Sequence, residues 1–94
     1  MKVTVLGTEI EVRVEELQDL HGHFDADKLL IRMDTKRKQQ SETFLHEVMH
    51  AALFVSGLTE IMGEEREEAV VRCLEHALFP LYGKPWKRVV EDDD

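Results

Sequence analysis

Alternating polar and apolar residues open the chain and predict a β-hairpin. Residues 2–6 and 9–14 both alternate, and most of their apolar members are β-branched, as strands prefer. Gly7 and Thr8 separate the two runs, and glycine at the first position of a two-residue loop is typical of a type II′ turn. We therefore expect an N-terminal hairpin with its loop at Gly7-Thr8.

The alternation weakens after the hairpin and is followed by a continuous apolar run. Residues 15–27 have no clear period, so we expect a turn-rich or briefly helical connection there. Leu29, Leu30 and Ile31 then follow one another without a polar residue, which is typical of a strand covered on both faces. The third predicted strand spans residues 28–33.

Two helices are predicted in the second half of the chain. The first covers residues 41–56, with Ser41 as its N-cap and Gly57 as its stop. The second covers residues 64–79 and ends near Pro80. Together these elements predict an α+β fold, in which a short antiparallel or mixed sheet of about three strands packs on the two helices.

Length and composition suit one small globular domain. The chain has 94 residues, of which 43% are apolar and 34% charged, so we expect a single folded domain, 1–94. Residues 81–86 are expected to fold back over the core, and the acidic tail, 87–94, to be flexible. No apolar run approaches the ~20 residues that a membrane span needs.

Charge and cysteine content narrow the partners and the compartment. A net charge of −8 repels nucleic acid and anionic membranes, so neither is an expected partner, and the basic run 36–38 is interpreted as a solvated connector. The chain starts in strand-like sequence rather than in a signal peptide, and its one cysteine, Cys73, cannot form an internal disulfide. These features favour the cytoplasm.

Residues 46–50 read HEVMH, an HExxH motif within the first predicted helix. Positions i and i+4 share a helix face, so His46 and His50 can direct ring nitrogens at one metal ion. A rotation of about 100° per residue places His50 about 40° and Glu47 about 100° from His46, so that Glu47 lies beside them and can polarise a bound water. The alternative is a pair of hydrated histidines on an ordinary helix.

A third metal ligand is expected on the second predicted helix, because catalytic zinc usually has three protein ligands. Glu67 falls in the middle of the apolar stripe of this helix and is predicted to point inward, where a metal would offset the cost of burying its charge. The remaining acids fall at the rim or in solvent: Glu64, Glu65, Glu68 and Glu75. Glu67 is therefore the predicted ligand, with Glu64 and Glu68 as substitutes; the alternative is a hydrated Glu67 near the helix start.

The remaining histidines are expected to lie outside the metal site. His76 falls about 180° from Glu67 on the second helix and is predicted to be a surface residue. His21 and His23 flank Gly22 in a predicted loop, where the simpler expectation is exposure and the alternative is contact with a substrate or transition state. A donor for the oxyanion cannot be assigned, and Tyr82 and the loop histidines are the candidates.

An HExxH helix followed by a glutamate on the next helix resembles the zincin metallopeptidases, specifically the glutamate-ligand branch called gluzincins. Within that branch the chain is most similar to small ImmA/IrrE-type and phage-encoded metallopeptidase-like proteins. The resemblance covers about residues 29–80, and the HExxH half is its more specific part. The chain departs from the family at Val70-Val71, where the family often has small residues followed by Asn or Asp.

The resemblance implies zinc-dependent hydrolysis of a bond in a peptide or protein substrate. In such a site His46, His50 and Glu67 would hold Zn²⁺, and Glu47 would be the general base that activates water. In zincins the strand before the motif helix is a sheet edge that pairs with an extended peptide. By resemblance this edge would be residues 28–33, with three substrate-binding residues: Leu29, Leu30 and Ile31.

Two other functions fit the same residues. One is an acidic interaction module, in which the zinc site is structural or vestigial and the negative surface docks onto a basic partner. The other is a zinc hydrolase that acts on a non-peptide substrate, since HExxH specifies activation of water rather than the substrate.

Overall fold

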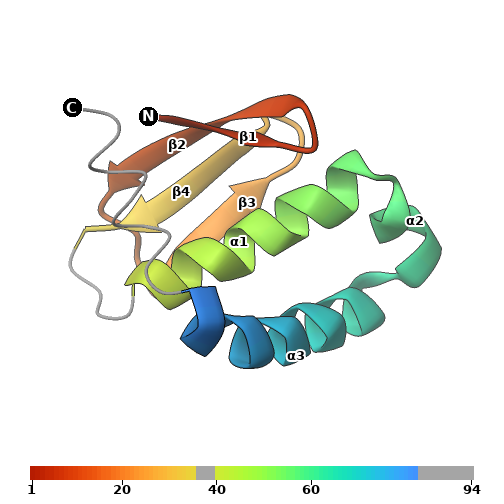
Figure 1. Cartoon of the computed structure of the whole chain (residues 1–94). Coiled ribbons are helices and arrows are strands. Elements are labelled where there is room, and N and C mark those ends of the chain that lie inside the picture. The colour runs from red at the N-terminus through yellow and green to blue at the C-terminus, as the bar shows by residue number, and fades with distance from the viewer. Residues whose placement is uncertain (36–39, 83–94) are drawn as a thin grey trace.

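Four strands and three helices form the described part of the chain, residues 1–35 and 40–82 of a computed structural model (Figure 1). The strands are β1 (Lys2–Val5), β2 (Thr8–Glu15), β3 (Gly22–Asp25) and β4 (Leu30–Asp34). The helices are α1 (Gln40–Val55), α2 (Leu58–Met62) and α3 (Glu64–Tyr82). The predicted α+β class is confirmed, although the sheet has four strands rather than about three. The predicted connector 36–38 and tail 87–94 lie outside the described residues.

The N-terminal hairpin is confirmed, but its turn lies one residue earlier than predicted. β1 and β2 pair antiparallel with Val5 opposite Thr8, so the two loop residues are Leu6 and Gly7. Their φ angles are 49° and 80°. Positive φ at both loop positions is the pattern of a type I′ turn rather than the predicted type II′ turn, and the twist of a type I′ turn matches that of the flanking strands.

A further strand, β3, lies within residues 15–27, where the sequence predicts a turn-rich or briefly helical connection. β3 pairs antiparallel with β4, with Gly22 opposite Met33 and Asp25 opposite Leu30. Its sequence, GHFD, contains glycine and aspartate, which are depleted in strands. Pairing with β4, rather than local preference, therefore makes this segment a strand.

β4 is an interior strand, so the prediction that residues 28–33 form a sheet edge is wrong. The strand order is β1-β2-β4-β3, with β4 parallel to β2 and antiparallel to β3. Leu30 and Ile31 are fully buried, and Leu29 lies in the turn before β4 with a φ of 49°. These three residues are not at an edge, because β3 occupies that position.

α1 and α3 correspond to the two predicted helices, with differences at their ends. α1 begins and ends one residue before the predicted bounds. α3 continues through Pro80 and ends at Tyr82, two residues beyond the expected end near Pro80. Residues 81 and 82 therefore belong to the helix rather than to the expected fold-back, whose other residues, 83–86, lie outside the described residues. Proline inside a helix removes a hydrogen bond and clashes with the preceding turn, and its position near the end of α3 confines this disruption to the last turn. No described helix has the length and hydropathy needed to cross a membrane.

α1 lies between the sheet and α3 (Figure 1). Phe44 and Ala51 lie on the face of α1 that packs against the sheet, and both are buried. The buried cluster that they join contains Val5, Ile10, Val12, Ile31 and Met33 of the sheet. The sheet thus covers the apolar face of α1, and the face that carries the HExxH histidines is turned toward α3.

Gly22 allows β3 to approach α1 closely. A Cβ atom at this position would lie 2.7 Å from Cγ2 of Thr43 and 3.4 Å from Cγ of Glu47. It would also lie 3.2 Å from the carbonyl oxygen of Arg32. Glycine is required here by the close approach of a strand backbone to a helix, rather than by a special φ angle. The edge strand therefore lies directly beside the glutamate of the HExxH motif.

We expect Gly22→Ala to lower the free energy of unfolding by about 1–3 kcal/mol, because the added methyl group would overlap the Thr43 side chain. Urea unfolding followed by circular dichroism measures this change. Thr43→Ser removes the Cγ2 atom, so Gly22→Ala should be less destabilising in a Thr43→Ser background. An equal loss in both backgrounds would contradict the assignment of the clash to Thr43.

Candidate metal centre

The two histidines of the HExxH motif lie side by side on α1, as predicted from their spacing. The Nε2 atoms of His46 and His50 are 3.2 Å apart, and the ring centroids are 4.8 Å apart. The two side chains are 18% and 16% exposed. Both Nε2 atoms are therefore directed at one small region between α1 and α3.

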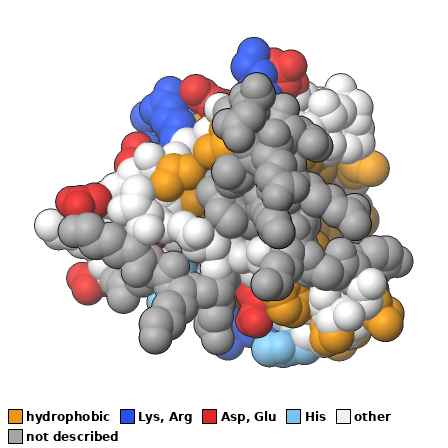
Figure 2. Space-filling model, turned by 60° about the vertical axis from the view of Figure 1, so that its left-hand side comes forward, with side chains coloured by type: hydrophobic (Ala, Val, Ile, Leu, Met, Phe, Trp, Pro, Cys, Tyr) orange, Lys and Arg blue, Asp and Glu red, His pale blue; other side chains and the backbone are white. Residues whose placement is uncertain are grey.

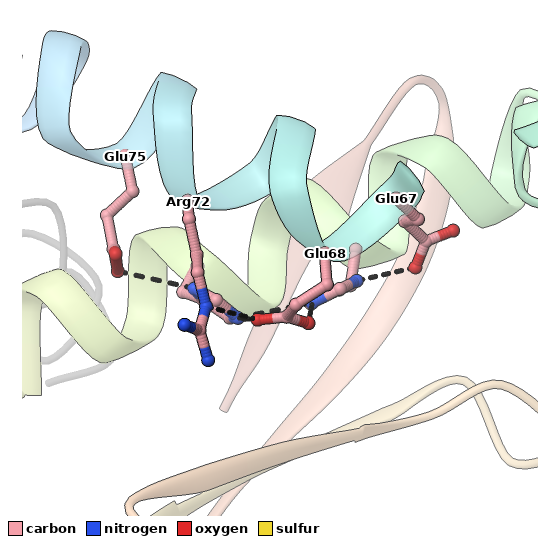
Figure 3. Close-up of polar contacts among 6 residues, drawn as sticks. Glu67, Glu68, Arg72 and Glu75 are labelled. Carbon is pink, nitrogen blue, oxygen red and sulfur yellow. Dashed lines mark hydrogen bonds and ion pairs between the residues drawn. The ribbon is translucent and has the colours of Figure 1, made fainter. Parts of the chain in front are cut away.

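Glu68 of α3 joins the two histidines at this region. Its Oε1 atom lies 3.1 Å from Nε2 of His46, and its Oε2 atom lies 3.1 Å from Nε2 of His50. One ligand atom from each of these three residues lies within 4.8 Å of the others. Figure 3 shows the Glu68 side chain reaching from α3 toward α1. Glu68, one of the two predicted substitutes, thus completes a group of three potential metal ligands; Glu64, the other, is exposed.

Glu67, the predicted third ligand, contacts the opposite side of the His50 ring. Its Oε2 atom lies 2.6 Å from Nδ1 of His50, while Nε2 of the same ring faces Glu68. The Glu67 side chain is 13% exposed, so the prediction that it points inward holds. Its position at Nδ1 favours Glu68 rather than Glu67 as the ligand.

The rotation of α3 explains why Glu68 reaches the site. Relative to Glu67, Val71 lies at about +40° around the helix and Glu68 at about +100°. Val71 is fully buried, whereas Val70 and Leu74, at about −60° and −20°, are 37% and 41% exposed. The face of α3 that packs on α1 is therefore rotated away from the centre of the apolar stripe, toward Glu68.

The same rotation brings Glu75 inward, although the sequence predicts it at the rim. Its Oε1 atom lies 3.4 Å from Nδ1 of His46, and its side chain is 14% exposed. Glu75 follows Glu68 by seven residues, or about two helical turns, so the two acids lie near one face. This spacing is the sequence signal that could have identified Glu75 once Glu68 was taken as the ligand.

Arg72 favours the ionised form of Glu68. Burial by itself raises the pKa of the Glu68 carboxyl, but a hydrogen bond donated by Arg72 and the charges on His46 and His50 together lower it below its ordinary value. The Arg72 Nε atom donates to Oε1 of Glu68 over 3.1 Å. A carboxylate must be ionised to bind a metal, so this environment suits a ligand.

Glu47 lies on the side of α1 that faces β3 and is 9% exposed. Burial raises the pKa of its carboxyl, while the charges on His46, His50 and His23 act in the opposite direction. A carboxylate with a raised pKa is a stronger base than one in water. The absence of a side chain at Gly22 contributes to this burial, because it lets the β3 backbone lie against the Glu47 side chain.

Two cavities of about 410 and 420 Å³ open onto the site. Both are lined by Gly22, His46, Glu47 and Glu68. The candidate metal ligands, the candidate base and the edge strand β3 are therefore accessible from the same open space.

The other histidines lie around these cavities. His23 belongs to β3 rather than to the predicted loop, and it lines the first cavity as an exposed residue. His21 and His76 are exposed, and both line the second cavity beside Arg72. The predicted exposure of His76 is confirmed. Tyr82 is the last residue of α3, and its side chain lies outside the described part of the structure.

The donor set fits a divalent cation. If the Nδ1 atoms of His46 and His50 carry the ring protons, both Nε2 atoms and the Glu68 carboxylate are acceptors that converge without a proton between them, while Arg72 donates to Oε1 of Glu68. A cation satisfies all three, and two imidazoles with one carboxylate are a common ligand set of catalytic zinc. Comparisons with protein-family models, curated proteins and solved structures give no match to this chain.

We expect Glu47→Gln to stabilise the metal-free protein at neutral pH. Folding raises the pKa of the Glu47 carboxyl above its ordinary value of 4.5, so the native state holds this proton more tightly than the unfolded state. The free energy of unfolding therefore falls as the pH rises from the unfolded-state pKa through the folded-state pKa. Glutamine does not titrate, so this loss should disappear. Thermal unfolding of chelator-treated protein, followed between about pH 4 and 8, measures this change of stability across and above the ordinary titration range of a glutamate.

Glu65→Gln is the matched control, since Glu65 is exposed and the charge change is the same. A Glu47→Gln protein that is less stable than the control at neutral pH would contradict the assigned effect of burial.

Proposed function

We propose that the protein is a cytoplasmic zinc-dependent peptidase that uses the HExxH motif of α1 together with Glu68 of α3. The observation that carries this proposal is the convergence of the His46 and His50 Nε2 atoms on the Glu68 carboxylate, next to the buried Glu47. The resemblance of the motif to zincins supports the same chemistry. Cys73 is free and exposed, which suits a reducing compartment.

The residues of the site have separate roles in this reaction. His46, His50 and Glu68 would hold zinc. The chemistry that zinc would supply there is Lewis-acid polarisation of the scissile carbonyl and a lowering of the pKa of water to about 7. Glu47 accepts a proton from the attacking water and passes it to the leaving amine. The raised pKa of Glu47, caused by its burial, favours the first of these transfers.

The outer edge of β3 is a suitable place for an extended peptide. β3 ends the strand order of the sheet, and Gly22 lines both cavities, so a peptide that pairs with this edge would cross the site. Phe24 of β3 and Phe54 of α1 lie with their ring centroids 5.9 Å apart and line the first cavity. These rings supply an apolar wall for a substrate side chain. The proposed substrate-binding strand is therefore β3 rather than residues 28–33.

An acidic interaction module is the second candidate, and the net charge of −8 favours it. Docking onto a basic partner requires a continuous acidic surface. In the described part of the face drawn in Figure 2, acidic side chains lie apart from one another, and some lie beside basic side chains near the top. Near the start of α3, however, four glutamates line one cavity with His50: Glu64, Glu65, Glu67 and Glu68. The second candidate is therefore kept, and the tests below separate it from the first.

We expect Glu47→Gln to retain zinc and to lose about 10²–10⁴-fold in the rate of peptide cleavage, because it keeps the ligands but removes the base. Zinc content is measured by elemental analysis, and cleavage by mass spectrometry on a mixed peptide library. Glu65→Gln, an exposed change on α3, should behave as the unaltered protein. Zinc binding without cleavage in the unaltered protein would instead support the interaction module.

We expect Glu68→Ala to weaken zinc binding by more than the ~10–100-fold that is usual for a residue that only supports a ligand. Competition with a chromophoric chelator measures the affinity. Glu65→Ala removes the same charge from the same helix and should bind zinc normally. Unchanged affinity in Glu68→Ala would exclude Glu68 as the third ligand.

A further inference from the structure

The two nitrogens of each histidine ring face different partners. The Nε2 atoms of His46 and His50 face each other and Glu68, as described above. The Nδ1 atoms face separate carboxylates: Glu67 is hydrogen-bonded to His50 at 2.6 Å, and Glu75 makes a longer ion-pair contact with His46 at 3.4 Å. Figure 3 shows Glu67 and Glu75 reaching from α3 on either side of Glu68. Each ring therefore has one nitrogen at the candidate metal position and one at an acid.

The arrangement follows from the antiparallel packing of α1 and α3. His46 and His50 are four residues apart, or about 6 Å along α1, whereas Glu67 and Glu75 are eight residues apart, or about 12 Å along α3. The two carboxylates thus bracket the histidine pair from outside, and Glu68 lies between them. This difference in spacing is what lets both Nδ1 atoms face outward to a carboxylate while both Nε2 atoms face inward.

Burial separates these two acids from the other acids of α3. The side chains of Glu67 and Glu75 are 13% and 14% exposed, whereas that of Glu68 is 40% exposed. A carboxylate in such a place is costly unless a partner compensates its charge. Within the described residues, Oε1 of Glu67 is buried without a hydrogen-bond partner, so the contact of its Oε2 atom with His50 is the compensation that this carboxylate receives.

A carboxylate at Nδ1 determines which nitrogen can bind a metal. Neutral imidazole has one protonated nitrogen and one with a free lone pair. An acceptor at Nδ1 holds the proton there, leaves the lone pair on Nε2, fixes the ring orientation and makes the ring a stronger ligand.

We infer that Glu67 and Glu75 are positioning residues of the metal centre, each holding the Nδ1 proton of one histidine so that both Nε2 lone pairs face the metal. This inference rests on the proposed zinc function and assigns Glu67 a role different from that of the ligand Glu68. It also gives a role to two acids that are largely buried between α1 and α3, where Val71 is the one fully buried side chain among the described residues of α3.

Zinc affinity tests the inference without reference to activity. Glu67→Ala and Glu75→Ala should each weaken zinc binding by about 10–100-fold, and Glu68→Ala should weaken it more. Glu75→Gln keeps an oxygen that can accept a hydrogen bond from Nδ1–H, so it should recover part of the affinity lost in Glu75→Ala. Glu65→Ala is the matched control for the loss of one negative charge on α3. Circular dichroism of each variant verifies the fold.

The protonation of the rings provides a readout that a purely structural role would not change. In ¹⁵N-labelled protein, long-range proton–nitrogen correlation spectra should report the Nδ1–H form of both histidines. Glu75→Ala should alter the pattern of His46 and spare that of His50, while Glu67→Ala should do the reverse. Leucine variants, which keep an apolar side chain of similar size but have no acceptor, serve the same purpose if an alanine variant fails to fold.

The outcomes separate the inference from the proposed function. Normal zinc affinity and unchanged ring protonation in Glu67→Ala and Glu75→Ala would overturn the inference while the zinc site stands. A loss in Glu67→Ala as large as that in Glu68→Ala would overturn it by making Glu67 a ligand. If the unaltered protein binds no zinc, the proposed function fails, and the ring spectra of the metal-free protein then decide whether the two acids hold the Nδ1 protons.

Discussion

The pairing of buried carboxylates with histidine nitrogens between α1 and α3 is the interaction on which the site depends. Val71 is the one fully buried side chain among the described residues of α3, so apolar burial alone orients this helix weakly. The contacts of Glu67 with His50 and of Glu75 with His46 join α3 to α1 at two further places and so favour one orientation of α3. A metal ion held by both helices would strengthen the same interface, because a ligand that binds only the native state stabilises it.

The close packing of β3 on α1 is the second constraint, and it links the sheet to the chemistry. A glycine at position 22 lets the strand backbone lie against Glu47, and the resulting burial raises the pKa of this carboxyl. The same strand ends the sheet and lines the cavities, so one short segment shapes the environment of the base and presents an edge to a substrate. β3 is therefore central to the proposed reaction although its sequence has little strand character.

Local patterns predicted the elements that depend on local interactions. Alternation in residues 2–6 and 9–14 predicted the hairpin, and the HExxH spacing placed His46 and His50 on one helix face. Local patterns do not predict a segment whose structure depends on a partner distant in the sequence. β3 forms because β4 pairs with it, and its presence turns the expected edge strand into an interior one.

The sequence by itself determined that two histidines share a face of α1 and that Glu67 lies on the apolar side of the next long helix, because i, i+4 spacing and helical rotation are properties of a single helix. Only the tertiary structure decided which acid meets which nitrogen. The apolar stripe of α3 is centred near Glu67, but α3 packs on α1 through a face turned toward Val71, and this rotation brings Glu68 to both Nε2 atoms and Glu75 to His46. The face that a helix buries depends on the surface of its partner as well as on its own, so the pattern of one helix could not predict this rotation.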